Sequence, residues 1–129
     1  MIEGAAASSH ASAHHVYSVA AGDMADRQYR PRLTQLAGDG TLTMHKSHWQ
    51  VWNRHKARGR GVGYLKNCNP DCGHSTDVRH VRMHLKAYRA RARCGVEVFT
   101  RYREAFVRKP RRDVPRVHIA HIDHPACNA

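Results

Sequence analysis

The chain has few of the residues that build a large hydrophobic core. Leucine, isoleucine, valine and phenylalanine together make up 21 of the 129 residues, about 16%. Such a low content with a high net charge is typical of chains in which a part stays disordered. No apolar run approaches the ~18 residues of a membrane-spanning helix, which excludes that class. A chain of this length is also too short for a multi-domain protein or a large enzyme.

Acidic residues are scarce too. Asp and Glu number 10 against 22 Lys and Arg, which gives a formal net charge of +12 with His neutral. Residues 54–112 hold 17 basic and four acidic residues. Charge of this density attracts polyanions, because binding releases their condensed counterions. A basic face that only keeps the protein soluble is the alternative. The candidate polyanion-binding side chains, on the exposed faces of strands, are Arg58, Arg60, Arg82, Lys86, Arg101 and Arg103.

The sequence lacks the motifs of common catalytic sites and nucleic-acid modules. It has no G-x-S-x-G elbow, no H-E-x-x-H pair and no P-loop, and it has neither a C2H2 finger nor an RRM signature. Ser47 and His48 are adjacent, and neighbours on a strand point to opposite faces. We therefore expect a protein without enzymatic activity and without a cofactor.

A signal peptide is also missing, since no apolar stretch of about 7–15 residues follows a basic start. Residues 1–29 are rich in Ala, Ser and His without a sustained period, which predicts a flexible leader. A β domain is expected over residues 30–123 and a short tail over residues 124–129.

Four cysteines are present: Cys68, Cys72, Cys94 and Cys127. An even number in a small, core-poor chain suggests disulfides, and four cysteines allow three connectivities. Free thiols in a reducing compartment are one alternative. Zinc held by Cys68, Cys72 and His74 is a weaker one, because the spacing is not the compact C-x2-C and Pro70 lies inside it. We expect no specific metal site.

Alternating side chains predict strands in the middle of the chain. Residues 94–102 alternate β-branched and aromatic side chains, and residues 58–66 alternate glycines with larger side chains. Residues 41–52 also have a strand composition, after a turn at residues 38–40. Residues 78–93 fit either a half-buried strand or a helix capped by Ser75, Thr76 or Asp77.

The order of several short motifs resembles a family of small secreted actinobacterial β-domain proteins of unknown function. The matching residues are Arg30-Pro31-Arg32, Asp39-Gly40-Thr41, Trp49-Gln50-Val51-Trp52, Ala57-Arg58-Gly59-Arg60-Gly61, Cys68-Asn69-Pro70-Asp71-Cys72 and Cys94-Gly95 with Phe99-Thr100-Arg101. The resemblance covers about residues 30–108. It implies an extracellular, mainly antiparallel β domain, and it favours a strand for residues 78–93. It supplies no catalytic residue.

Together these features predict a small all-β antiparallel sandwich or partly closed barrel behind a disordered leader. A disulfide among Cys68, Cys72 and Cys94 is expected to join the loop at residues 67–73 to the last strands. The expected function is that of a secreted non-enzymatic protein that binds anionic surfaces or polymers, nucleic acid among them. The alternatives are an intracellular, basic nucleic-acid-binding accessory protein with reduced cysteines, with or without zinc, and a small metal-dependent nuclease. The sequence does not predict an oligomeric state.

Overall fold

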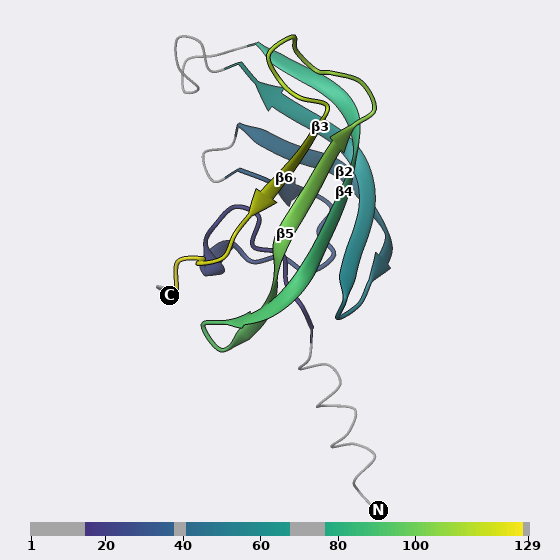
Figure 1. Ribbon diagram of the computed structural model, residues 1–129. Coiled ribbons are helices and arrows are strands. Elements are labelled where there is room, and N and C mark those ends of the chain that lie inside the picture. Colours follow the sequence, from purple (N-terminus) through teal and green to yellow (C-terminus); the bar gives the residue numbers. More distant parts are fainter. Residues whose placement is uncertain (1–14, 38–40, 68–76, 128–129) are drawn as a thin grey trace, which may run out of the picture.

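The computed structural model describes residues 15–37, 41–67 and 77–127 (Figure 1). Six antiparallel strands form one sheet in the order β1-β2-β3-β4-β5-β6, so that each strand pairs with the next along the chain. The sheet curls into a half-barrel, which confirms the predicted small all-β domain with a partly closed barrel. The strands are β1 (Thr34–Gln35), β2 (Leu42–Trp52), β3 (Lys56–Lys66), β4 (Val78–Arg93), β5 (Val96–Phe106) and β6 (Val117–His121).

The segment that fitted either a strand or a helix is the long strand β4. It pairs with β3 from Lys56↔Tyr88 to Lys66↔Val78, and its other edge pairs with β5. Val81, Met83 and Leu85 point into the concave side and are buried, while the residues between them are exposed. This alternation of buried and exposed residues has the period of a strand. The backbone of β4 is bonded on both of its edges, to β3 and to β5.

Local sequence explains the hairpin that joins β4 to β5. Cys94 and Gly95 both have positive φ angles, of 54° and 77°. Positive φ at both central residues is the requirement of a type I′ turn, whose twist matches that of the two strands. The hairpin between β2 and β3 is held by Asn53, whose side-chain oxygen accepts hydrogen bonds from the backbone N–H groups of His55 and Lys56.

Glycines on the inner face of β3 allow the sheet to curl closely around its core. A Cβ atom at Gly59 would lie 2.5 Å from the Trp49 ring, and one at Gly61 would lie 2.5 Å from the His45 carbonyl oxygen. Only a residue without a side chain permits this approach. The interior that results is filled by Met44, Met83, Leu85, Phe99, Tyr102 and Phe106.

Residues 15–29 are part of the folded domain, so the predicted flexible leader is wrong over this range. Val16, Val19, Ala20 and Met24 are buried, and a short 3-10 helix, η1 (Met24–Asp26), is the only helix in the described ranges. The segment follows no regular period, so its apolar residues gave no periodic signal. Their burial depends on a tertiary surface that the distant strands supply.

Backbone and indole hydrogen bonds fix this segment between the two ends of the sheet. Tyr17 pairs in parallel with Val98 on the edge of β5, beyond the end of β6. From the other side, the Trp52 indole N–H donates to the Val16 carbonyl at 2.8 Å. The Trp49 indole N–H donates to the carbonyl of Pro31, just after the segment, at 2.8 Å. The segment, purple in Figure 1, therefore runs from β5 to β2 and closes part of the barrel opening.

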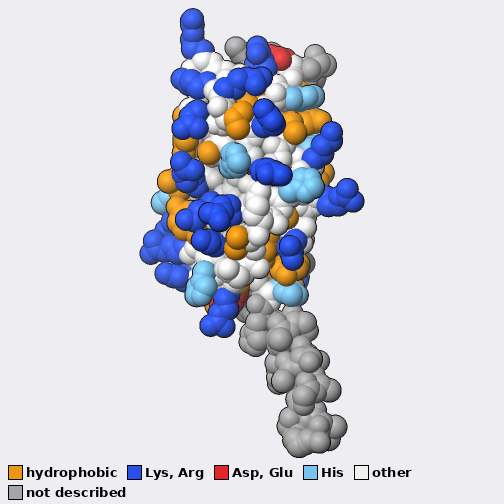
Figure 2. Space-filling model, turned by 90° about the vertical axis from the view of Figure 1, so that its right-hand side faces the viewer, with side chains coloured by type: hydrophobic (Ala, Val, Ile, Leu, Met, Phe, Trp, Pro, Cys, Tyr) orange, Lys and Arg blue, Asp and Glu red, His pale blue; other side chains and the backbone are white. Residues whose placement is uncertain are grey.

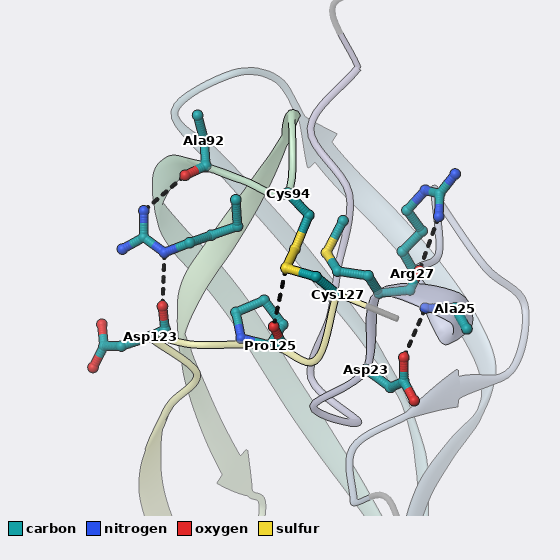
Figure 3. Close-up of a disulfide and its surroundings, with 10 residues drawn as sticks. Asp23, Ala25, Arg27, Ala92, Cys94, Asp123, Pro125 and Cys127 are labelled. Atoms are coloured by element: carbon teal, nitrogen blue, oxygen red, sulfur yellow. Dashed lines mark hydrogen bonds between the residues drawn. A yellow bond between two sulfur atoms is a disulfide. The ribbon is translucent and has the colours of Figure 1, made fainter. Parts of the chain in front are cut away.

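The C-terminal residues return to the same end of the molecule, where Cys94 and Cys127 form a disulfide with Cα atoms 5.6 Å apart (Figure 3). The expected bond between Cys94 and the 67–73 loop is therefore wrong. Backbone bonds between Met24 and the Ala126 carbonyl and between Ala126 and the Gly22 carbonyl hold the tail beside the N-terminal segment. The folded part thus extends beyond the predicted domain limit at residue 123 to at least Cys127.

Cys68 and Cys72, the turn at residues 38–40, most of the 67–73 loop and residues 1–14 lie outside the described residues. Within the described ranges no helix has the length and apolar character needed to cross a membrane.

Candidate anion-binding face

Strict alternation along β4 places basic side chains on the convex side of the half-barrel. His80, Arg82, His84 and Lys86 are exposed there, between buried residues that point inward. Figure 2 looks onto the side of the molecule formed by β3 and β4, and it shows Lys, Arg and His side chains spread over this surface with few acidic ones among them. We call the surface of outward-pointing residues on β2, β3, β4 and β5 the convex face.

The sheet register brings three predicted residues into one line, which we call the cation row. Arg58 on β3 lies opposite Lys86 on β4, and Lys86 lies opposite Arg103 on β5. All three side chains are exposed. Like charges directly opposite each other on a sheet destabilise it by about 0.2–1 kcal/mol per pair. The cation row therefore has a stability cost that solubility alone does not require.

A second line lies next to the cation row and contains a groove. Here His48 on β2 lies opposite Arg60 on β3, and Arg60 lies opposite His84 on β4. The groove has a volume of about 520 Å³. Its walls are lined by Lys46, His48, Arg60, Arg82 and His84, and its remaining lining residues are Gly61, Val62, Met83 and Val107. Among the described residues, no acidic side chain lines it.

A β-bulge turns Lys46 toward the groove. The register of β2 against β3 shifts between His45 and His48, and Lys46 has a φ angle of 54°. Ser47 points inward, where its hydroxyl bonds to Thr34 and to the Met44 carbonyl. Lys46 therefore becomes an additional outward-facing residue between His45 and His48, as bulges typically re-aim side chains.

The bulge explains why Lys46 and His48 were not predicted as residues of the convex face. Strict alternation from Met44 would place Lys46 and His48 on the buried side, whereas both are exposed. His84 alternates with the buried residues of β4, and that signal was sufficient to place it on the convex face. Arg60 and Arg82, which were predicted, line the same groove.

Arg101, the sixth predicted residue, belongs to a different arrangement. Its guanidinium donates to the Asp123 carboxylate at 2.7 Å, and only 15% of its side chain is exposed. This hydrogen bond holds the pKa of Asp123 below its ordinary value. Arg101 therefore joins β5 to the segment after β6, and the structure does not group it with the five exposed cations.

A second basic cavity, of about 580 Å³, lies where β4 begins and the segment after β5 passes. Its lining residues are Asn67, Arg79, Lys109, Pro110, Arg111, Arg112 and Asp113. Arg111 donates to the carboxylate of Asp77 at 3.1 Å and lowers the pKa of that carboxyl. One of its cations is thus already paired, so the groove on the convex face is the better candidate for an anion.

No metal centre is found in the described part of the chain. No group of three or more His, Cys, Asp or Glu side chains there is placed to hold a metal ion, and Cys68, Cys72 and His74 lie outside it.

Glu104 is buried on the inner face of β5, 3.5 Å from His118. Burial raises the pKa of the Glu104 carboxyl, and the nearby His118 opposes this rise.

Comparison with known proteins gives no relative: no protein-family model, no curated protein and no solved structure matches the chain.

Proposed function

We propose that this protein binds an extended anionic polymer or anionic surface through its convex face and acts without catalysis. The carrying observation is the cation row, in which Arg58, Lys86 and Arg103 stand opposite one another across three strands. A ligand that lies across the row neutralises three charges whose mutual repulsion the free protein has to tolerate. The adjoining groove adds Lys46, Arg60 and Arg82 to the same surface.

We further propose that the protein is extracellular and belongs with the small secreted β-domain proteins that its motifs resemble. The disulfide between Cys94 and Cys127 supports an oxidising compartment, because such bonds are rare in the cytosol. Intact mass of the isolated protein with and without reductant tests this point. A mass unchanged by reduction, with zinc retained on native spraying, would favour the intracellular alternative.

Salt-dependent binding to a fluorescent long-chain polyphosphate tests the proposed function. The triple variant Arg58→Gln, Lys86→Gln, Arg103→Gln removes the cation row. The matched control, Arg30→Gln, Arg32→Gln, Arg54→Gln, removes three exposed charges outside it. Each phosphate contact contributes about 0.7–0.9 to the slope of log affinity against log salt. We expect the first variant to lower the slope by about 2–3 and the control to change it much less. Equal losses in both variants would refute a specific face.

A further inference from the structure

Three aromatic rings are stacked on the convex face, on three successive strands. The His45 and Tyr64 rings are 3.7 Å apart between centroids at an interplanar angle of 18°. The Tyr64 and His80 rings are 3.9 Å apart at 16°. We call this arrangement the ring stack. It is held at its β2 end, where the Thr43 hydroxyl lies 3.0 Å from Nε2 of His45.

The ring stack borders the basic groove directly. Two of the groove residues lie two positions from the ring stack on the same faces of their strands: Val62 precedes Tyr64 on β3, and Arg82 follows His80 on β4. His45 lies opposite Val62, and Lys46 follows it in the bulge. Flat aromatic surface and fixed positive charge are therefore neighbours on one continuous face.

The ring stack ends at an exposed side chain. His80 is the exposed member, whereas His45 and Tyr64 are half-buried. The pairing of β4 with β5 begins at Met83, so His80 lies on β4 beyond the end of the β5 ladder. An additional flat ring that stacks on His80 extends the series from three rings to four.

We propose that the anionic polymer is single-stranded nucleic acid, whose phosphates lie in the groove of Lys46, Arg60 and Arg82 and one of whose unpaired bases stacks on His80. This inference rests on the proposed function and names the ligand class of the same face. Grooves of positive charge beside aromatic platforms are the general means of binding single strands, since every base has a flat π surface. Polyphosphate and anionic lipid headgroups carry charge but no such flat ring. In a nucleic-acid duplex the paired bases are covered by the neighbouring base pairs.

The experiment compares ligands that carry equal charge but differ in their bases. The full chain is titrated at pH 8 with a labelled 12-nucleotide thymidine strand and with an abasic strand of the same length. Stacking adds about 1–3 kcal/mol per base, which is about 5- to 150-fold in affinity. We expect the thymidine strand to bind at least five-fold tighter than the abasic strand.

Variants locate the stacking site. His80→Ala is expected to abolish the preference for thymidine and to leave the affinity for the abasic strand unchanged. The control, His55→Ala, removes an exposed histidine in the β2–β3 turn and is expected to keep the preference. Tyr64→Leu, which retains apolar volume, is expected to weaken the preference, and thermal unfolding of each variant establishes that it is folded.

Each possible outcome separates the two proposals. Equal affinity for the thymidine and abasic strands overturns the nucleic-acid inference and leaves polyanion binding in place. A preference that persists in His80→Ala overturns the assigned stacking site. Failure to bind either strand and polyphosphate overturns both the inference and the proposed function on which it rests.

Discussion

The side chains of Arg58 and Lys86 stand directly opposite each other on β3 and β4, both exposed to solvent. Cross-strand partners have Cβ atoms about 5 Å apart, so the two positive charges repel each other. Arg103 repeats the arrangement on the other side of Lys86. Lys86 thus experiences repulsion from both neighbouring strands at once.

Lys86→Glu replaces this double repulsion by a double attraction. We expect the free energy of unfolding to rise at low salt, because two cross-strand attractions of about 0.2–1 kcal/mol each, about 0.4–2 kcal/mol together, replace two repulsions. The gain is expected to shrink in 1 M salt, where the screening length is about 3 Å. Urea unfolding at both salt concentrations measures this gain in the free energy of unfolding. The affinity of the same variant for polyphosphate is expected to fall. A variant less stable than the wild type at low salt would contradict this account.

The disulfide should hold the two chain ends that close the barrel. Cys94→Ser with Cys127→Ser opens a covalent link across 33 residues and is expected to cost about 2–5 kcal/mol of unfolding free energy. Because the Met24 N–H donates to Ala126 and the Ala126 N–H donates to Gly22, we also expect faster amide exchange at Met24 and Ala126. Denaturant unfolding and hydrogen exchange test the two statements. A loss below ~1 kcal/mol would mean that the bond contributes little to closure.

The Tyr102 hydroxyl links the N-terminal segment to the core. It accepts a hydrogen bond from the Val19 N–H and donates one to the Phe99 carbonyl, each at 2.7 Å. Tyr102→Phe leaves both buried backbone groups without this partner and is expected to cost about 1–3 kcal/mol. Chemical denaturation of the variant measures this loss.

Alkaline titration provides a second test of Tyr102. Burial raises the pKa of Tyr102 to about 12 from its ordinary value of 10, so the folded state retains the proton more strongly than the unfolded chain. The stabilisation is complete below pH 10 and is lost as the pH rises toward 12. The free energy of unfolding of Tyr102→Phe should not show this part of the decrease at alkaline pH. Unfolding measured between pH 9 and 12 tests the difference. An identical alkaline profile in both proteins would exclude Tyr102 as its source.

Glu104 should make the protein less stable at neutral pH than an uncharged side chain of the same shape. Burial raises the pKa of this carboxyl, so the folded state binds its proton more tightly than the unfolded chain. Stability from this group is therefore highest below the unfolded pKa and falls as the pH rises through the folded one. Glu104→Gln is expected to be more stable than the wild type at pH 7, with a difference that narrows toward pH 4.

The partner of Glu104 supplies the control for this prediction. His118 lies 3.5 Å from the carboxylate and opposes the effect of burial. His118→Ala is expected to increase the advantage of Glu104→Gln at pH 7, because the carboxylate then has no imidazole beside it. Thermal unfolding of the two single variants and the double variant measures the coupling. Independence of the two substitutions would show that the pair does not interact.

The period-two pattern determined most of the sheet before any tertiary information. The pattern of residues 78–93 fitted a strand as well as a helix, and its strand reading placed Arg82 and Lys86 outward, as in β4, because successive residues of a strand face opposite sides. The alternating glycines of β3 were readable for the same reason, whereas the turn at Cys94-Gly95 was expected to be part of a strand over residues 94–102. Each of these features depends on geometry within a few residues of the chain.

Only the tertiary structure decided the features that depend on distant partners. Val16, Val19, Ala20 and Met24 are buried because β5 and β2 offer them a surface, and Cys94 bonds to Cys127 because the tail returns to the β4–β5 hairpin. The bulge at Lys46 breaks the alternation of β2. The ion pair with Asp123 separates Arg101 from the exposed cations of the convex face. Local pattern thus determined which side chains point outward where the alternation of a strand is unbroken. Long-range pairing decided which of them lie together, since register and closure are properties of several strands at once.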